Sequence, residues 1–302
     1  MLGRWSQARL CIEAHPTDDL LCAQWCTEIG LLRAMPLCTT HQQDRTIVRR
    51  ANLHLNRDHL FWRCSRCKDQ ISIRNGSIFN NVKLSLGKTL MLIMCFAQGQ
   101  IIEDARRALM WSSDASEIAV TTVVRLYDRL RARIAEHVST QGLIGGPGII
   151  VQIDEALIGR RKYNRGRLAR GTWVLGMIAE NGDVRFEIIE NRSAVTLEAV
   201  IVRNVAIGSI IHTDEWRAYS RLCELGYTHA TVNHSERFVS PEGVHTQRIE
   251  SQWRQIRRVT SRGGIHHDDI KSYLAEYVWR RGCRFTHTDT FNALLQILRA
   301  EE

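Results

Sequence analysis

The chain has 302 residues, of which 44% are hydrophobic and 24% charged; this excludes a disordered chain and leaves room for two or three domains. Its net charge of +9, supplied largely by arginine, favours a polyanionic partner, because basic surfaces release the counterions condensed on phosphates. The longest apolar run, residues 90–97, is too short to span a membrane and no secretory signal is seen, so we expect a soluble intracellular protein with no membrane partner.

Three segments are expected before residue 141. Residues 1–34 form an N-terminal helical segment, because apolar residues recur there at helical spacing. Residues 35–80 mix Cys, His and aromatic residues without that period, which predicts a small zinc-ribbon-like unit. Residues 81–140 contain three helical stretches, the last rich in arginine. They form either a helix-turn-helix DNA-binding region or an ordinary helical connector.

The Gly- and Pro-rich residues 141–148 mark a domain boundary, and the pattern changes beyond them. The segment 146–302 begins with a buried strand and a hairpin at Asn181 and Gly182. Further elements are expected, in the order helix 196–205, strand 209–213, helix 215–225, strand 229–234 and helices 245–259 and 270–282. This order predicts an α/β fold, a ribonuclease H-like mixed sheet with flanking helices.

Two pairs of acidic residues follow predicted strands. Asp154 and Glu155 end the first strand, and Asp214 and Glu215 end a later one. Alternation along a strand places the two members of each pair on opposite faces. The first strand is expected to be buried on both faces, so its apolar residues leave open which acid faces the site. Carboxylates gathered at strand ends can hold two divalent cations about 4 Å apart for attack on phosphodiesters.

A third acid, Glu250, lies on the predicted helix 245–259, with 35 residues between it and Asp214. It shares one helix face with Arg254 and Arg257, beside an apolar stripe. Taken singly, each acid is better explained by a helix cap or a surface ion pair. All three together favour a metal site. Their mutual repulsion should raise at least one pKa, and bound Mg²⁺ would offset that repulsion.

At this point the chain resembles a known family, the DDE transposases of the Merlin type and their bacterial insertion-sequence relatives. The resemblance is carried by QIDEALIGRRKYNRGR, TWVLGMI, GSIIHTDEWRAY, YTHATVNHSERFV and GVHTQRIESQWRQIRR. Upstream, WRCSRCKDQISIRNGSIFNNVKLSL resembles the zinc-binding part of the same transposases. The likeness spans roughly residues 30–285.

The resemblance implies a catalytic triad of Asp154, Asp214 and Glu250, with Arg257 where such transposases carry a basic residue. It implies two Mg²⁺ or Mn²⁺ ions per active site, serving DNA nicking at an element end and attack of the freed 3′-hydroxyl on target DNA. The implied partners are double-stranded DNA, as terminal inverted repeats and target, and further copies of the chain in a homo-oligomer. The working compartment would be the nucleus if the source is eukaryotic, and the cytoplasm or nucleoid if it is bacterial.

A structural Zn²⁺ site is expected from two short Cys/His pairs. Cys38 and His41 form C-x2-H, and Cys64 and Cys67 form C-x2-C after a gap of 22 residues. The related transposases usually show two cysteines in the first pair, so that pair stays open. In a shifted alignment Met35 would replace the first cysteine, and Cys26, His54 or His59 would be substitute ligands. Buried thiols without a metal are the remaining alternative.

A basic run without acids follows Asp154, and it is either a solvated face or a phosphate-positioning surface beside the acids. We favour the second interpretation, which predicts DNA contacts by Arg160, Arg161, Lys162, Arg165 and Arg167, together with Arg254. Two rival functions remain. One is a domesticated DNA-binding protein that no longer cuts, and the other is a ribonuclease H-like nuclease without strand transfer.

Overall fold

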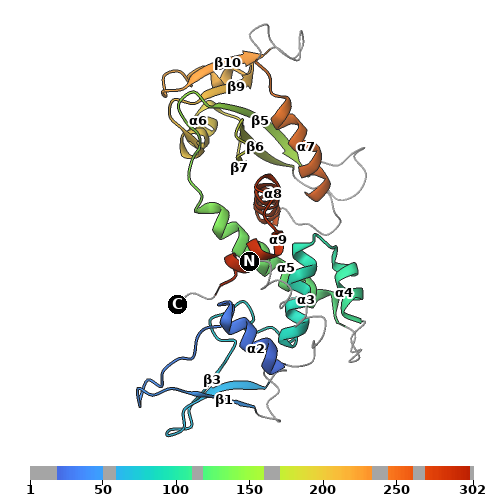
Figure 1. Ribbon diagram of the computed structural model, residues 1–302. Coiled ribbons are helices and arrows are strands. Elements are labelled where there is room, and N and C mark those ends of the chain that lie inside the picture. Colours follow the sequence, from blue (N-terminus) through green and yellow to red (C-terminus); the bar gives the residue numbers. More distant parts are fainter. Residues whose placement is uncertain are drawn as a thin grey trace. The chain divides into compact units, whose positions relative to one another are not determined.

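We describe the protein from a computed structural model (Figure 1). The described residues are 19–49, 59–110, 118–159, 171–232, 244–260 and 269–299. The chain divides into two compact units: unit 1 comprises Met1–Arg133 and Thr288–Glu302, and unit 2 comprises Ile134–His287. Among the described residues, no helix is long and apolar enough to cross a membrane.

Unit 1 contains a small antiparallel sheet at the expected zinc-ribbon-like segment. Its strands are β1 (Thr46–Arg49), β2 (Leu60–Arg63) and β3 (Gln70–Ser72), in the order β1-β2-β3. The fully buried Arg45 donates to the carboxylate of Asp69 at 2.7 Å and to its carbonyl oxygen at 3.0 Å. This pair joins the start of β1 to the turn before β3, where a sheet this small has little core of its own.

The predicted N-terminal helix appears as α2 (Asp19–Glu28), with Trp25 buried. The three predicted helices after the sheet are confirmed as α3 (Leu86–Ala97), α4 (Ile102–Met110) and α5 (Val120–Ser139). Ser85 caps α3 by accepting a hydrogen bond from the Lys88 amide at 3.3 Å. Whether the three helices form a DNA-reading helix-turn-helix stays a prediction.

The last helix, α9 (Thr290–Ile297), packs in unit 1 although we assigned its residues to the catalytic domain. The Thr290 hydroxyl donates to the carbonyl of Ala97, the last residue of α3, at 3.0 Å. Phe291 and Leu294 of α9 are buried. The helix is amphipathic, and its sequence alone does not say which core its apolar face joins.

Unit 2 is built on a five-stranded mixed sheet of order β10-β9-β5-β6-β7. Its strands are β5 (Ile150–Ile158), β6 (Thr172–Ala179), β7 (Val184–Ile189), β9 (Ile210–Asp214) and β10 (Thr228–Val232). β5, β6 and β7 pair antiparallel with one another in chain order, while β9 is parallel to β5 and β10 is parallel to β9. An antiparallel meander extended by parallel strands beside its first member is the ribonuclease H-like arrangement, so the predicted fold class is confirmed. A short parallel pair, β4 (Ile144–Gly145) with β8 (Val205–Ala206), lies outside this sheet.

The predicted hairpin joins β6 to β7. The amide of Ala179 donates to the carbonyl of Asp183 at 2.8 Å, and Gly182 has a φ of +95°. A side chain at Gly182 would meet the Phe285 ring at 2.5 Å, so this turn needs glycine for both its conformation and its packing.

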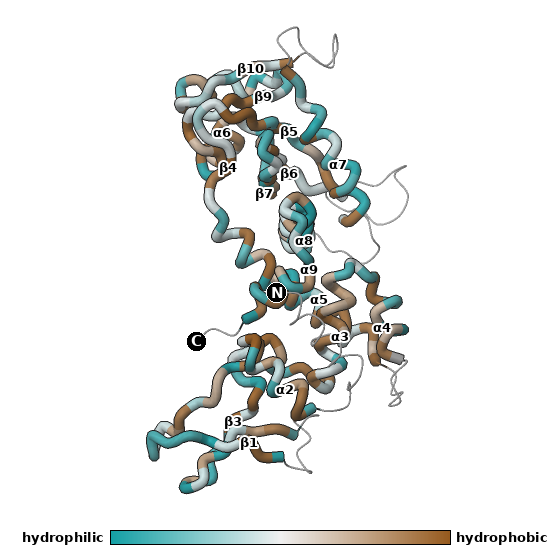
Figure 2. The backbone as a smooth tube through the Cα atoms, in the orientation of Figure 1, coloured by the Kyte–Doolittle hydropathy of each residue, from teal (hydrophilic) through white to brown (hydrophobic). Residues whose placement is uncertain are grey.

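Helices cover the two faces of the sheet separately (Figure 1). On one face, Val151 and Ile153 of β5 pack in a core with α6 (Ala194–Asn204). On the other, Ala156 and Ile158 pack with α7 (Gln247–Thr260) and α8 (Ile270–Phe285). Figure 2 shows α7 as a largely teal, hydrophilic helix with shorter brown, hydrophobic stretches. Strand alternation therefore decides which helix each β5 side chain meets.

The predicted helix 215–225 is wrong. The structure has only a short 3₁₀ helix, η2 (Arg217–Tyr219), followed by turns. The amide of Trp216 donates to the side chain of Asp214 at 3.1 Å, and the amides that follow bond three residues back. An Asp side chain that captures a nearby amide gives the backbone an alternative to a regular helix.

Candidate active site and metal centre

Asp154 and Asp214 lie on neighbouring parallel strands, but only Asp214 ends its strand. β5 continues four residues beyond Asp154, to Ile158, so the expectation that Asp154 ends the first strand is wrong. In the register of β5 and β9, Gln152 is opposite His212. The pairing of the two strands ends there, two residues before each acid, and the charge of Asp214 is close enough to contribute to the raised pKa of Asp154. Both acids fall on the sheet face that α7 covers. The fold thus brings together the first two acids that the sequence singled out.

The environment of Asp154 disfavours a negative charge. Burial, together with the nearby charges of Glu155 and Asp214, raises the pKa of Asp154 to about 6. The Trp253 indole acts in the other direction, since its Nε1 donates to Asp154 Oδ2 at 2.7 Å. The rise in pKa that we expected for at least one acid is therefore found here. A bound cation would favour the ionised form.

Trp253 reaches Asp154 because the facing position of the next strand is glycine. Gly176 of β6 pairs with Asp154, and a Cβ at Gly176 would lie 2.7 Å from the Trp253 ring. The indole also makes an edge contact with Phe186, with ring centroids 5.4 Å apart. Packing therefore fixes the orientation of the hydrogen-bond donor that holds Asp154.

Glu155 points to the opposite face, where its charge is neutralised. Its side chain is 1% exposed and lies 3.1 Å from the guanidinium of Arg192, and the Tyr219 hydroxyl donates to its other oxygen. Arg192 in turn lies between the rings of Trp173 and Trp216, at 4.9 and 4.6 Å from their centroids. Asp154, and not Glu155, thus shares the face of α7.

Sequence reasoning missed Arg192 and Tyr219. They are 37 and 64 residues from Glu155 along the chain, and no local spacing signals contacts of that range. The one available signal was indirect: a buried strand with two consecutive acids needs a cation for the acid on its other face.

Asp214 and Glu215 also separate. Asp214 is partly buried and accepts the Trp216 amide, while Glu215 is exposed after the end of β9. This hydrogen bond engages one oxygen of Asp214, Oδ1. Asp214 is therefore the member of the pair that the sheet holds in place.

Glu250 lies in the first turn of α7, and its side chain accepts a hydrogen bond from the residue just before the helix. The Thr246 hydroxyl donates to Glu250 Oε1 at 2.7 Å. The helix itself is fixed by Gln152, a 2% exposed residue of β5, whose Oε1 accepts the amides of Arg248 at 2.9 Å and Ile249 at 3.4 Å. The strand that carries Asp154 therefore sets the position of the helix that carries Glu250.

The basic residues predicted to contact DNA are described only in part. Arg254 and Arg257 are exposed on α7, at the helical spacing that places them on the side of Glu250. The predicted contacts Arg160, Arg161, Lys162, Arg165 and Arg167 lie outside the described residues. Arg254 is thus the one predicted DNA contact with a described position.

The donor set of the three acids suits a hard divalent cation. Carboxylate oxygens are the ligands that Mg²⁺ and Mn²⁺ prefer, and the crowding of Asp154 and Asp214 is the repulsion that such ions relieve. Within the described ranges, however, only the Cys/His group of unit 1 gathers three or more ligand atoms closely enough for one ion. Two metals bridged by pairs of carboxylates do not require all three acids around one ion.

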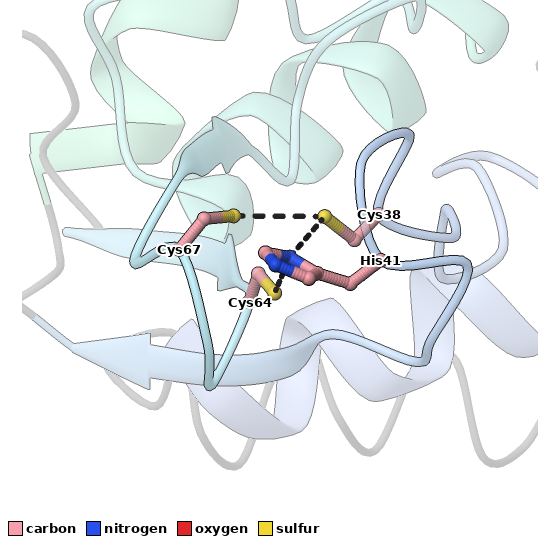
Figure 3. Close-up of side chains that lie close together, drawn as sticks. All are labelled: Cys38, His41, Cys64 and Cys67. Carbon is pink, nitrogen blue, oxygen red and sulfur yellow. Dashed lines mark hydrogen bonds between the residues drawn. The ribbon is translucent and has the colours of Figure 1, made fainter.

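The predicted zinc ligands Cys38, His41, Cys64 and Cys67 come together in unit 1 (Figure 3). Their ligand atoms all lie within 4.8 Å of one another. Cys38 Sγ is 3.6 Å from Cys67 Sγ, and His41 Nδ1 is 3.7 Å from Cys38 Sγ and from Cys64 Sγ. A tetrahedral site with zinc–sulfur distances of about 2.3 Å has edges of about 3.8 Å, so four ligands of this spacing fit Zn²⁺.

The surroundings of Cys38 and Cys64 favour the thiolates that zinc needs, whereas burial and the neighbouring thiols raise the pKa of Cys67. Burial raises the pKa of Cys64, but backbone amides of Cys67 and Arg66 donate to its sulfur, and the net pKa falls to about 6. Gln43 Nε2 also donates to Cys64 Sγ at 3.3 Å. Amides that converge on the first cysteine of each pair are what a closed structural zinc site requires.

The alternative zinc ligands are not part of this group. Cys26 is buried in α2, and neither it nor His59 belongs to the four-residue cluster. His54 lies outside the described residues. The first pair that the sequence left open is therefore Cys38 with His41.

A family comparison matches much of unit 2. Residues 144–282 match the model of the ISXO2-like transposase domain. The match begins at β4 and ends within α8, so it contains all five strands of the large sheet and the three acids. It supports the bacterial insertion-sequence side of the resemblance noted from the sequence.

Individual relatives are more distant. An uncharacterized transposase-like protein of Haemophilus influenzae is 29% identical over 94 residues, which cover 31% of this chain and 76% of that protein. Among solved structures, the Mos1 transposase in a pre-cleavage transpososome aligns at a TM-score of 0.28 and 9% identity, over 71% of this chain and 98% of that one. In a paired-end complex with the left transposon end the TM-score is 0.31 at 12% identity, over 70% and 93%.

These TM-scores are too low to assign the fold. The fold is assigned from the order and direction of the strands in the large sheet. The family match is independent of those scores. Over residues 144–282 this chain is therefore similar to the ISXO2-like transposase domain, and the match supports a transposase of the bacterial insertion-sequence type.

Proposed function

We propose that the protein is a DDE-type DNA transposase that binds element ends, cleaves DNA phosphodiesters and joins the 3′-hydroxyl to target DNA. One observation carries the proposal: in a segment that matches a transposase domain, Asp154 and Asp214 lie on adjacent parallel strands, on the face covered by the helix of Glu250. These three carboxylates would hold two Mg²⁺ or Mn²⁺ ions. When bound, the ions would activate the attacking oxygen and stabilise the leaving oxygen.

The chain's own residues would position these carboxylates. The Trp253 indole, the Trp216 amide and the Thr246 hydroxyl each donate to one acid, which engages one oxygen and fixes the orientation of the other. Arg254 and Arg257 line the exposed side of α7 and would contact DNA phosphates. We extend the same role to the basic residues 160–167. A homo-oligomer would hold two element ends together. The protein would act in the nucleus of a eukaryotic host, or in the cytoplasm or nucleoid of a bacterial one.

The test is a cleavage and strand-transfer assay on duplexes carrying the DNA that flanks the gene, with and without Mg²⁺ or Mn²⁺. Asp214→Asn should lower cleavage by about 10³-fold or more, since it removes a metal ligand. Glu215→Gln, one residue further and exposed, is the matched control and should cut like the wild type. Equal loss in both variants, or equal activity, would count against this assignment.

The rival functions give different products. A domesticated DNA-binding protein would retain the duplex but show no cleavage above the Asp214→Asn background. A nuclease of the same fold would release nicked DNA without joined molecules. Joined products that depend on a 3′-hydroxyl and on a divalent cation would exclude both rivals.

A further inference from the structure

Unit 1 contains a cavity that no part of the proposed chemistry uses. Its volume is about 370 Å³, within the range of roughly 300–1,000 Å³ that is usual for ligand pockets. One wall is the run of turns at residues 76–81, after β3. The cavity is also lined by Arg129 and Arg133 of α5 and by Arg299, just after α9. All of these residues belong to unit 1.

The lining is strongly basic. Three arginines line the cavity, and none of its lining residues is acidic. A fourth guanidinium lies against the wall, because a Cβ at Gly76 would be 2.8 Å from Arg33 Nε. The remaining polar lining residues, Ser77, Asn80 and Asn81, are uncharged. A cavity of this composition attracts an anion.

One of the lining arginines, Arg129, is held in place by neutral groups. Arg129 Nη1 donates to the carbonyl oxygens of Ile78 at 3.0 Å and Asn80 at 2.6 Å, and both of these acceptors are uncharged. The buried Arg74 donates to the carbonyls of Val82 at 2.7 Å and Leu84 at 2.8 Å, which fixes the far end of the turns. The arginines therefore line a preorganised pocket, and little ordering is needed on binding.

The chemistry selects phosphate among anions. Planar guanidinium groups match phosphate oxygens in pairs, and Arg129 and Arg133 are one helical turn apart on the same face of α5. A single phosphodiester carries one charge, fewer than the arginines gathered here, which favours a run of backbone phosphates over an isolated ion. We propose that this cavity is a phosphate site that holds the backbone of double-stranded DNA, a proposal that rests on the DNA-directed function above.

The experiment measures DNA affinity of the full chain, loaded with zinc, for a mixed-sequence duplex of about 30 base pairs, because backbone contacts are independent of sequence. Fluorescence anisotropy at several salt concentrations gives both affinity and its salt dependence. Arg133→Gln and Arg299→Gln are tested singly and together. Arg107→Gln is the matched control, since it removes the same charge from an exposed residue of unit 1 that does not line the cavity.

Each lost phosphate contact removes about 0.9 from the slope of log K against log salt, which is about tenfold in affinity near 0.1 M salt. The double variant should therefore lose about 1.8 in slope, while Arg107→Gln should match the wild type. Arg129→Lys keeps the charge and should lose less than either single variant. Unchanged thermal midpoints would show that the fold is intact. Wild-type slope and affinity in the double variant would overturn the proposal.

Two further readouts separate the possible sources of phosphate and the two proposals. If inorganic phosphate raises the thermal midpoint of the wild type but not of the double variant, and DNA binding is equal in both, the pocket takes free phosphate and the DNA assignment is wrong. If the double variant binds DNA weakly while the wild type fails to cleave element-end DNA, the pocket stands and the transposase proposal fails. If the wild type cleaves element-end DNA and the double variant binds DNA as the wild type does, the transposase proposal stands and the pocket proposal fails.

Discussion

The two candidate metal sites differ in how far the chain alone assembles them. In unit 1 the four Cys and His ligand atoms lie within 4.8 Å of one another, and backbone amides donate to their sulfurs. In unit 2 the register brings Asp154 and Asp214 together, and burial and like charge raise the pKa of Asp154 to about 6. A structural site can close completely around its ion, whereas a catalytic site must keep positions open for substrate.

The largest expected effect breaks the closed site. Cys64→Ser removes a zinc ligand, and because structural zinc binding is coupled to folding, unit 1 should lose its ordered structure. Bound zinc should fall from about one ion per chain to less than about 0.1, measured by elemental analysis, with rapid proteolysis of residues 35–80. Cys223→Ser, which replaces an exposed thiol in unit 2, is the control and should retain zinc. Full zinc occupancy in Cys64→Ser would show that this set of ligands is wrong.

A second effect separates the two acids of β5. Arg192→Met leaves the buried carboxylate of Glu155 without its ion pair, and the free energy of unfolding should drop by about 3 kcal/mol. Arg203→Met, at an exposed arginine 4.0 Å from Glu187, should change stability by less than about 1 kcal/mol. Denaturant titration of both variants provides the measurement.

Adding Glu155→Gln to Arg192→Met should restore part of the loss, because the buried charge is then removed as well. If the double variant is as unstable as Arg192→Met alone, the stacking of Arg192 between Trp173 and Trp216 matters more than its ion pair.

The third prediction concerns how the raised pKa of Asp154 makes stability depend on pH. Asp154 has a pKa of about 6 in the folded protein against an ordinary value of 3.8, so the folded state binds the proton more tightly. The contribution of Asp154 to stability is therefore largest below about pH 4 and is lost as the pH rises through about 6. Without divalent cations, Asp154→Asn should be more stable than the wild type by about 3 kcal/mol at pH 7 and equal to it near pH 3.5.

Thermal melts at both pH values, in buffer free of Mg²⁺, give the comparison, and the variant is compared with the wild type at the same pH because acid also releases the zinc of unit 1. Asp183→Asn, at an exposed acid in the β6–β7 turn, is the control and should behave like the wild type at either pH. If Asp154→Asn is destabilised at pH 7, the carboxylate is stabilised in the fold and the inferred repulsion is wrong.

The sequence predicted features that depend on neighbouring residues better than features that depend on contacts between residues far apart in the chain. Zinc-ligand spacing, the hairpin at Asn181 and Gly182 and the strand order depend on local pattern, and the structure agrees with them. The choice between Asp154 and Glu155 on physical grounds needed Arg192, which is distant in the chain. The helix predicted at 215–225 failed because the Asp214 side chain binds a backbone amide instead, a competition that apolar periodicity does not report.

The smallest expected effect concerns the partner that orients Asp154. Trp253→Phe keeps a ring beside Phe186 but removes the indole donor 2.7 Å from Asp154 Oδ2. Losing a hydrogen bond that orients a metal-binding carboxylate typically costs about 10-fold to 100-fold in metal affinity. We expect the Mg²⁺ concentration for half-maximal cleavage to rise about tenfold, with little change in the rate at saturating Mg²⁺. Phe186→Leu disturbs the same packing without touching the donor, so an equal rise in that variant would assign the effect to packing and not to the hydrogen bond.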